Sequence, residues 1–272
     1  MYKTRNGYIY SPSDLNAFLD NEAVTWLDRF AIERPGTLTR DEAEAEQELV
    51  RQSGDEHEQR FLDELRKAGP VVEIDRNGDD PLRKTAAAMR SGCAVIYQAC
   101  LERDEFRGWA DFLFRVDGPS DLGAWHYEVW DTKLARGMKP YFAIQLCCYA
   151  EMLDSLQGLR PNGAGIILCN VQRQPLRVDD YWYYYQAVKR AFLQQQRTFD
   201  PDQPPPFPGM ADYRHWTGHV ERLLEERDDV SHTADITTPQ MEKLAGAGIT
   251  TMKGLAQSKL ATVPKMARTT FE

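Results

Sequence analysis

The chain has 272 residues, of which 42% are hydrophobic, and this is enough for one large domain with its own core and a smaller second one. The N-terminal segment MYKTRNGYIYSPSDL has no apolar run of signal-peptide length, and no later segment has the composition of a membrane span. The composition therefore indicates a globular protein and predicts a cytoplasmic location.

The formal net charge of −9 is unevenly distributed along the chain. Between Asp41 and Glu64 there are ten acidic residues against two arginines, which accounts for nearly the whole excess. From Gln240 to the end there are five basic residues against two acidic ones. Because the negative charge is local, the net value does not exclude DNA as a partner.

The first 68 residues are expected to contain two helices. Residues 12–30 begin with serine and aspartate capping candidates and then repeat apolar residues at helical spacing. The acidic run that follows is expected to be a solvated connection into a helix over about residues 52–68. In that helix His57, Phe61 and Leu65 form a stripe at i, i+4 and i+8.

The central part of the chain has the pattern of a mixed α/β domain. The predicted strands cover residues 71–74, 94–102, 107–116, 126–134 and 163–171. The predicted helices cover residues 81–92, 140–157 and 179–197. Because the middle three strands follow one another with only turn segments between them, we expect a β-meander flanked by helices.

A proline-rich segment divides the chain. Residues 201–209 contain five prolines and form the clearest linker, and a predicted helix at about 212–228 follows. The expected organisation has three parts: a core with an N-terminal helical region over 1–200, the linker and its flanking helix over 201–232, and a small helical segment over 233–272.

Two aspartates of the predicted meander are expected to share one site. Residues two apart in a strand lie on the same face, so Asp131 and Lys133 project together. Asp111 interrupts an otherwise apolar stripe in the preceding strand, and an unpaired buried carboxylate needs a cation as its partner. A divalent metal between the two aspartates would satisfy both, whereas Lys133 would satisfy only one.

The helix that follows carries a row of polar and aromatic side chains. Tyr141, Gln145 and Tyr149 recur at i, i+4 and i+8, so they line one face. Such a row can simply border a half-buried helix face. Its order after GWAD and DTK favours a functional role at the same site.

These motifs resemble a known nuclease family. GDEHE (54–58), GWAD (108–111), EVWDTK (128–133) and QLCCY (145–149) are similar to the RecB-like branch of the PD-(D/E)XK nucleases, which includes CRISPR-associated and helicase-linked members. The resemblance covers about the first 230 residues. It implies an α/β, restriction-endonuclease-like core with a central mixed β-sheet flanked by helices, to which the tail adds a small helical C-terminal appendage.

The resemblance also implies roles for particular residues. It implies a Mg²⁺ or Mn²⁺ site with four ligands: His57, Asp111, Asp131 and the main-chain carbonyl of Thr132. Lys133 would orient or activate the attacking water, and Gln145 and Tyr149 would contact DNA near the scissile phosphate. Hard oxygen ligands suit Mg²⁺, which can activate water and neutralise charge on phosphorus. His57 remains open to a second interpretation, as a core side chain of its apolar stripe.

The chain departs from some relatives in its cysteines. Several RecB-like proteins hold an iron–sulfur cluster with cysteines near the N-terminus and in the C-terminal flank. The corresponding segments here, residues 18–27 and 209–223, contain no cysteine, so no iron–sulfur cluster is expected. The five cysteines of the chain include no CxxC pair, which predicts reduced thiols in the core.

The C-terminal segment TTPQMEKLAGAGITTMKGLA (237–256) resembles a helix-hairpin-helix element. Its backbone amides would contact DNA phosphates, or the hairpin would pack against a neighbouring domain. The ending ARTTFE has no helix-stop signal, so we expect a piece of a longer chain. The resemblance implies that a helicase or further nuclease region can follow in such a chain.

Two functions from different classes follow from the sequence. The first is a metal-dependent DNA nuclease acting on single strands or DNA ends in repair, recombination or defence. The second is a non-catalytic DNA-binding or assembly module that keeps the nuclease fold. Asp111, Asp131 and Lys133 favour the nuclease. The rings of Tyr141, Tyr149 and residues 181–185 would either stack on unpaired bases or pack in the core.

Overall fold

The structure, a computed structural model, describes residues 1–42 and 45–266. It divides into two compact units: Met1–Leu19 with Ala43–Thr198, and Asp20–Glu42 with Phe199–Glu272. The change of unit after Thr198 lies close to the boundary predicted at residue 200. Residues 20–42, which the sequence placed in the core, group with the C-terminal residues instead. The ending ARTTFE lies outside the described residues.

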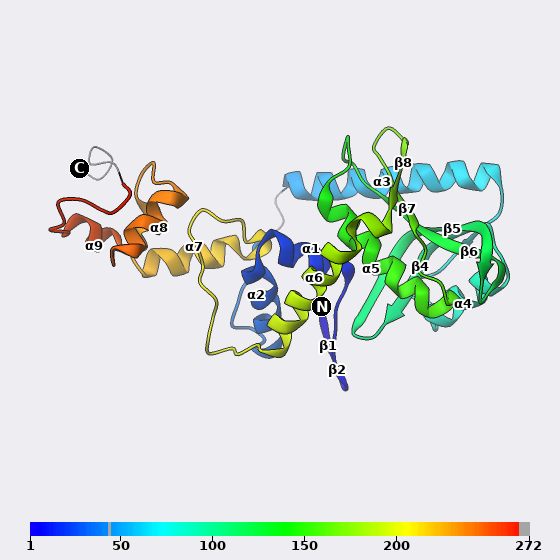
Figure 1. Ribbon diagram of the computed structural model, residues 1–272, viewed down its shortest axis with the longest axis horizontal. Helices are drawn as coiled ribbons and strands as arrows, with labels where there is room; N and C mark the ends of the chain where they lie inside the picture. Colours follow the sequence, from blue (N-terminus) through cyan, green and yellow to red (C-terminus); the bar gives the residue numbers. More distant parts are fainter. Residues whose placement is uncertain (43–44, 267–272) are drawn as a thin grey trace. The chain divides into compact units, whose positions relative to one another are not determined.

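The first unit is built on a six-stranded sheet whose strands lie side by side in chain order (Figure 1). The strands are β3 (Val71–Glu73), β4 (Val95–Arg103), β5 (Phe106–Ser120), β6 (Gly123–Thr132), β7 (Gly163–Ile167) and β8 (Arg173–Arg177). β4, β5 and β6 form the predicted antiparallel meander, while β3 and β7 pair parallel with β4 and β6. The prediction of an α/β fold with a central mixed sheet is thereby confirmed. β8 was not predicted, because its sequence RQPLR contains a proline, which strands tolerate at a sheet edge.

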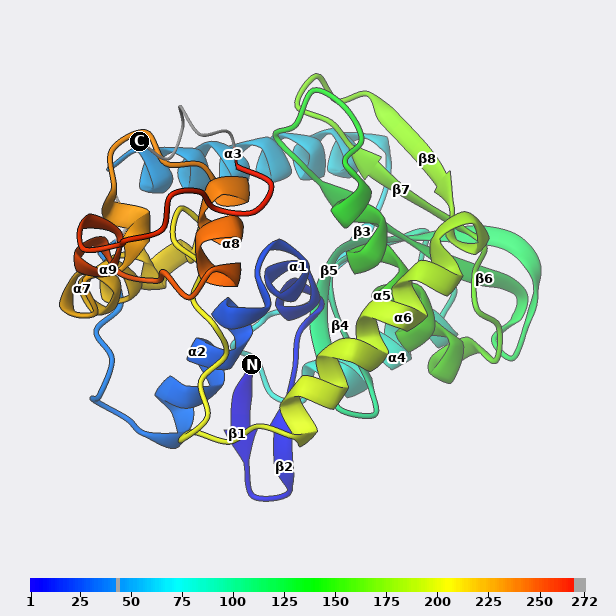
Figure 2. The same ribbon diagram turned by 60° about the vertical axis from the view of Figure 1, so that its left-hand side comes forward.

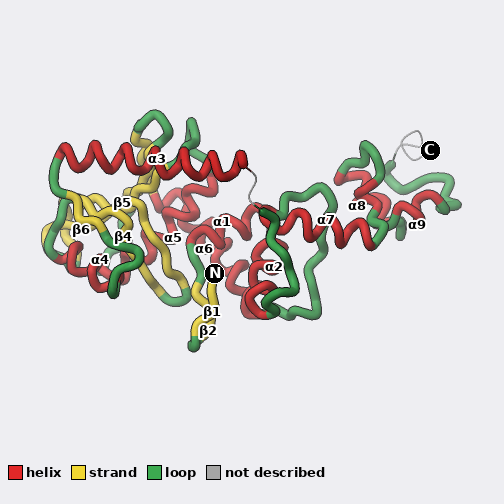
Figure 3. The backbone as a smooth tube through the Cα atoms, turned by 180° about the vertical axis from the view of Figure 1, so that it is seen from behind, coloured by secondary structure: helices red, strands yellow, loops and turns green. Residues whose placement is uncertain are grey.

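Helices cover both faces of this sheet, as Figures 1 and 3 show. The helices of the unit are α1 (Pro12–Asp20), α3 (Ala45–Ala68), α4 (Pro81–Arg90), α5 (Pro140–Gln157) and α6 (Val178–Arg197). On one face Phe61 and Leu62 of α3 pack against Phe112 of β5. On the other face α5, with α6 against it, packs on Leu113 and Val129. Alternation along β5 explains the division, since Phe112 and Leu113 point to opposite sides.

The single helix expected over residues 12–30 is in fact two helices. Asn21 interrupts it in an extended conformation, with φ of −162°, and its side chain accepts a hydrogen bond from the Ala23 amide at 3.0 Å. Asparagine is a strong N-cap, so it starts a new helix, α2 (Glu22–Glu33), where the apolar spacing alone predicted continuity.

Helix α3 begins by Ala45, so the predicted start near residue 52 was too late. Arg51 pairs with Glu48 at 2.6 Å and with Asp55 at 3.2 Å, its neighbours three residues before and four residues after. Ion pairs at this spacing stabilise a helix without any apolar face. The acidic run is therefore helical from residue 45, and the apolar stripe marks only its packed part.

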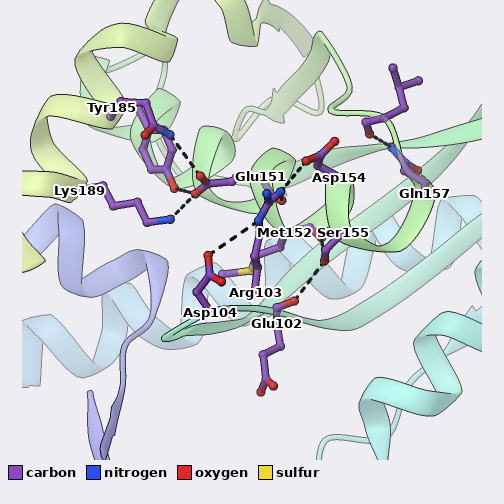
Figure 4. A network of polar contacts seen from close by, with 12 residues as sticks. Glu102, Arg103, Asp104, Glu151, Met152, Asp154, Ser155, Gln157, Tyr185 and Lys189 are labelled. Atoms are coloured by element: carbon purple, nitrogen blue, oxygen red, sulfur yellow. Dashed lines mark hydrogen bonds and ion pairs between the residues drawn. The ribbon is translucent and has the colours of Figure 1, made fainter.

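A partly buried polar network fixes α5 to α6 and to the end of β4 (Figure 4). Glu151 of α5 accepts hydrogen bonds from Lys189 Nζ and the Tyr185 hydroxyl, both at 2.5 Å. Arg103 Nη1 donates to the Glu151 carbonyl at 2.7 Å and to Asp154 Oδ2 at 2.6 Å. Burial raises the pKa of Glu151, but the hydrogen bonds from Lys189 and Tyr185 outweigh it, so the pKa lies below its ordinary value.

The second unit is mainly helical over its described residues. Its helical elements are α2, η1 (Arg214–Trp216), α7 (Thr217–Glu226), η2 (Val230–His232), α8 (Thr238–Gly246) and α9 (Met252–Ala256). Figure 2 shows α8 and α9 joined by a short turn. They share a small core that contains Leu244 and Ile249, and Gly248 in the turn has a φ of +81°, a conformation that favours glycine. Glycine is thus required by the backbone of this hairpin.

The N-terminus forms a hairpin that the sequence did not predict. Strands β1 (Tyr2–Thr4) and β2 (Gly7–Ile9) pair antiparallel as a separate two-stranded sheet. Its short strands are mostly exposed, so they lack the apolar alternation by which strands are recognised.

Across residues 1–42 and 45–266, no helix is both long and apolar enough to cross a membrane.

The five cysteines are unpaired thiols. Cys100, Cys147 and Cys148 are buried, and burial raises the pKa of Cys147 to about 12. Such thiols are poor nucleophiles and poor metal ligands at neutral pH. Cys93 and Cys169 are only partly buried, so the expectation of core thiols holds for three of the five.

Candidate active site

Asp111 and Asp131 meet where β5 and β6 reach the end of their pairing. Leu113 lies opposite Val129 in the antiparallel register, and the two aspartates are the next residues on the same face of each strand. Their carboxyl groups lie within hydrogen-bonding reach of each other. The structure therefore brings together the two carboxylates that the sequence assigned to one site.

Thr132 holds Asp111 in place. Its main-chain amide and its hydroxyl both donate to Asp111 Oδ2, each at 2.8 Å. In a regular strand the Thr132 side chain would point away from Asp131. Because β6 ends at Thr132, the hydroxyl instead reaches across to the neighbouring strand. The threonine thus orients one carboxylate through both its backbone and its side chain.

Lys133 forms an ion pair with Asp131 Oδ2. The main-chain amide of Lys133 donates to the Ile167 carbonyl at 2.9 Å, so the chain stays beside β7 after β6 has ended. Burial lowers the pKa of Lys133, but the charges of Asp131 and Asp111 outweigh it and the pKa lies above its ordinary value. Lys133 is therefore an ammonium ion at neutral pH and can donate hydrogen bonds but cannot take up a proton.

The site carries more negative than positive charge. Burial, followed by the charge of Asp131 and that of Glu58, raises the pKa of Asp111 well above its ordinary value, although Lys133 opposes the shift. Asp131 is 2% exposed, and its Oδ2 touches the ammonium without accepting a geometrically sound hydrogen bond. A buried and a half-buried carboxylate beside one ammonium leave an excess charge, which must be met by a proton or by a further cation.

His57 of α3 lies close to this site, because it contacts the strand beside Lys133. It is 1% exposed, and its Nε2 lies 3.3 Å from the Ile167 carbonyl oxygen, the atom that also accepts from Lys133. Its Nδ1 is buried without a hydrogen-bond partner. In the part of the chain that the structure describes, no group of three histidine, cysteine, aspartate or glutamate side chains is arranged to hold a metal. His57 thus contacts the same carbonyl as the Lys133 amide, and its place among the metal ligands stays a prediction.

Two neighbours of Asp111 were missed by the sequence argument. Glu58, beside His57 on α3, accepts from the Tyr97 hydroxyl at 2.8 Å and from the Gln98 amide group. Gln98 follows Tyr97 on β4, opposite Asp111 in the register, and has a positive φ of 55°. Such strain in a residue other than glycine often marks a functional site. Glu58 could have been found from the GDEHE segment, whereas nothing in the sequence marks Gln98.

Gln145 and Tyr149 face a pocket beside the aspartates. Tyr149 is 4% exposed and its hydroxyl donates to the Trp109 carbonyl at 2.7 Å. Burial and the charges of Asp131 and Asp111 raise its pKa well above its ordinary value. Both α5 side chains line a pocket of about 480 Å³. A Cβ on Gly108 would lie 2.7 Å from the Tyr149 ring, which explains the glycine of the GWAD motif.

Only some of the tyrosines are free to stack on bases. Tyr149 and Tyr185 are 4% and 0% exposed, so for these two the alternative of core packing holds. Tyr183 and Tyr184 are 87% and 55% exposed, and Tyr141 is 36% exposed. Among these tyrosines, the exposed rings at the start of α6 and α5 are the ones available to stack on bases.

Comparison with known proteins does not assign the chain. It matches no protein-family model and no curated protein.

Proposed function

We propose that the chain is a metal-dependent DNA nuclease that hydrolyses phosphodiester bonds. The observation that supports this most strongly is the Asp111–Asp131 pair with Lys133 beside it, placed at the ends of two adjacent strands. Mutually repelling buried carboxylates destabilise a fold unless a ligand uses them. A site of this kind suits a phosphate substrate, because a bound cation would link the carboxylates to the phosphate oxygens.

The donor atoms of the pair fit Mg²⁺ or Mn²⁺, which prefer hard oxygen ligands. Asp111 and Asp131 would hold the ion, and the resemblance to RecB-like nucleases adds the Thr132 carbonyl and His57. The unpartnered Nδ1 of His57 supports its inclusion, although its ring is directed to Ile167 in this structure. The ion would supply a water of lowered pKa and would offset negative charge on the phosphate.

Lys133 has a positioning role in this proposal. Its ammonium is held on Asp131, and its raised pKa keeps it charged. It can donate hydrogen bonds to the attacking water and to a phosphate oxygen, where negative charge develops during hydrolysis. Removal of the proton from water falls to another group, since a charged lysine cannot act as a base.

The fold is compatible with the RecB-like assignment, which we retain as part of the proposal. The six-stranded mixed sheet flanked by helices supports the proposal of a restriction-endonuclease-like core. The α8–α9 pair with Gly248 in its turn has the features expected of a helix-hairpin-helix appendage. Its turn amides would contact DNA phosphates without reading sequence.

The proposed substrate is single-stranded DNA or a DNA end. The exposed rings of Tyr183 and Tyr184 support this choice, because aromatic rings can stack on bases only when the bases are unpaired. A biological role in repair, recombination or defence follows from the resemblance alone, as does a helicase or further nuclease region in the same longer chain.

A second function, a DNA-binding module without turnover, is favoured by one observation. The Nε2 atom of His57 lies 3.3 Å from the Ile167 carbonyl oxygen, so this nitrogen is engaged within the fold. If this arrangement persists when DNA and metal are present, the chain would bind DNA without cutting it.

The test is cleavage of labelled single-stranded and duplex DNA with Mg²⁺, with Mn²⁺ and with a chelator. We expect metal-dependent cleavage that Asp131→Asn abolishes. The matched control is Asp117→Asn, an exposed aspartate on β5, the strand that carries Asp111, and this variant should cut normally. Metal-dependent cleavage by Asp131→Asn at the wild-type rate would refute the site, and binding without any cleavage would establish the module.

A further inference from the structure

A pocket lies next to the Asp111–Asp131 pair in the first unit. It has a volume of about 480 Å³, which is ample for a nucleotide-sized ligand. It is bounded by the start of α1, by β5 and by α5, with Tyr2 of the N-terminal hairpin at its edge. The described residues that line it include two arginines, Arg76 and Arg107, and no aspartate or glutamate. In a chain of net charge −9, this is a local surface suited to an anion.

Arg76 is held in place without losing its charge. Its Nε donates to Gln98 Oε1 at 2.7 Å, and its guanidinium lies 5.4 Å from the centroid of the Trp109 ring. Both partners are neutral, so they orient the guanidinium without offsetting its charge. A guanidinium fixed in this way loses little entropy when it binds a phosphate. Arg107 Nε, by contrast, donates to Glu102 Oε2 at 2.5 Å, so the charge of Arg107 is partly offset by this carboxylate.

The pocket leads directly to the carboxylates. Gly108 and Trp109 line the pocket, and Asp111 follows two residues after Trp109 on β5. Gln98, which holds Arg76, lies opposite Asp111 in the register of β4 and β5. Tyr149 connects the two regions as well, since its hydroxyl is bonded to the Trp109 carbonyl.

We propose that this pocket binds one nucleotide of an unpaired DNA strand a short distance from the bond to be cut. The phosphate lies on Arg76 and Arg107, and the base packs against the rings of Tyr2 and Trp109. The proposal rests on the nuclease function above and adds a substrate-positioning site outside the metal-binding residues. The pocket requires an unpaired nucleotide, because duplex DNA hides the faces of its bases.

The test measures binding without turnover. Wild-type protein in a metal chelator is titrated into a fluorescent oligothymidylate, and anisotropy is followed at two salt concentrations. Arg76→Ala should weaken binding by about tenfold, the size expected for one charge-assisted contact. It should also reduce the dependence of log affinity on log salt by about 0.7, as for one phosphate of a single strand. Arg76→Lys, which keeps the charge, should restore part of the affinity.

The matched control is Arg115→Ala. Arg115 also lies over a tryptophan, with its guanidinium 6.0 Å from the Trp125 ring, and donates to a backbone carbonyl, but it is not among the residues of the pocket. Its substitution should leave affinity within about twofold, since it removes no proposed contact. If Arg76→Ala and Arg115→Ala bind alike, the pocket does not hold the phosphate.

Tyr2→Ala provides a second variant on an exposed hairpin, where folding is not at risk. It should weaken binding by about fivefold, as for loss of one stacked base. Thymidine monophosphate should compete for the pocket, whereas thymidine and inorganic phosphate should each compete less well. Equal competition by phosphate alone would reduce the site to an anion site and overturn its base contact.

The outcomes separate this proposal from the nuclease assignment. Loss of binding by Arg76→Ala in a protein that never cleaves DNA would support the pocket and reject the enzyme. Normal cleavage together with unchanged binding by Arg76→Ala would support the enzyme and reject the pocket. Thermal unfolding of Arg76→Ala is measured alongside, and Tyr2→Ala decides the question if Arg76→Ala does not fold.

Discussion

Helix α5 packs between two charged clusters that differ in how well their charges are satisfied. On its side toward α6, Glu151 accepts from Lys189, Tyr185 and Gln186, and its pKa lies below its ordinary value despite burial. On the sheet, Asp111 and Asp131 share one ammonium, and the pKa of Asp111 lies well above its ordinary value. The first cluster stabilises the ionised form of Glu151, whereas the second destabilises the ionised form of Asp111.

The contrast distinguishes a charged cluster that supports the fold from one that is suited to binding a ligand. A buried carboxylate with several donors is explained by the fold that it supports. A buried and a half-buried carboxylate with too few donors need a reason beyond the support of the fold, and a ligand that binds both is such a reason.

The largest effect is expected on catalysis. Asp131→Asn should reduce the single-turnover cleavage rate by about 10²-fold or more, since loss of one such group typically has this effect. Glu151→Gln, in the satisfied cluster, should leave the rate within a few-fold under conditions where the protein is folded. Equal slowing of both variants would show that the clusters do not differ in function.

The next effect is on stability and concerns the satisfied cluster. Lys189→Met should lower the free energy of unfolding by about 2–3 kcal/mol, because it leaves Glu151 buried without its cation. Urea denaturation measures the change. The double variant Lys189→Met with Glu151→Leu should recover part of the loss, and full additivity of the two changes would show that the residues are not coupled.

The opposite sign is expected at the proposed site. Asp111→Asn should raise the free energy of unfolding by about 1 kcal/mol in a chelator at neutral pH, because it removes the repulsion between Asp111 and Asp131. Thermal unfolding with and without Mn²⁺ checks it. The wild type should gain stability from Mn²⁺ and the variant should not; a variant less stable than the wild type in the chelator would contradict the excess of negative charge.

The smallest effect is on the pH dependence of stability. Glu151 has a lowered pKa in the fold, so its contribution is present above its unfolded pKa and is lost as pH falls. Asp111 has a raised pKa, so its contribution is full below its unfolded pKa and declines as pH rises. Glu151→Gln should flatten the acid limb of the stability curve, and Asp111→Asn should remove a decline toward neutral pH. Each change should be below about 1 kcal/mol per pH unit, and identical curves for both variants would contradict the opposite signs.

Local geometry made part of the fold and of the site predictable. The meander of β4, β5 and β6 and helix α5 follow from periodicity and turn residues, and α5 begins at Pro140 as predicted. The pairing of Asp111 with Asp131 follows from the same-face rule once the two strands are adjacent. At Asn21 the N-cap hydrogen bond starts a new helix, so the apolar spacing wrongly predicted one continuous helix.

The sequence by itself determined which side chains share a strand face or a helix row, because these relations depend only on backbone period. It could not determine what approaches those faces from distant segments. Arg76 reaches the site from a loop. Gln98 reaches it from β4, where its own backbone is in a left-handed conformation, and Glu58 reaches it from α3. Only the tertiary structure decided their positions, because contacts between segments far apart in the chain depend on the packing of whole elements and leave no local period in the sequence.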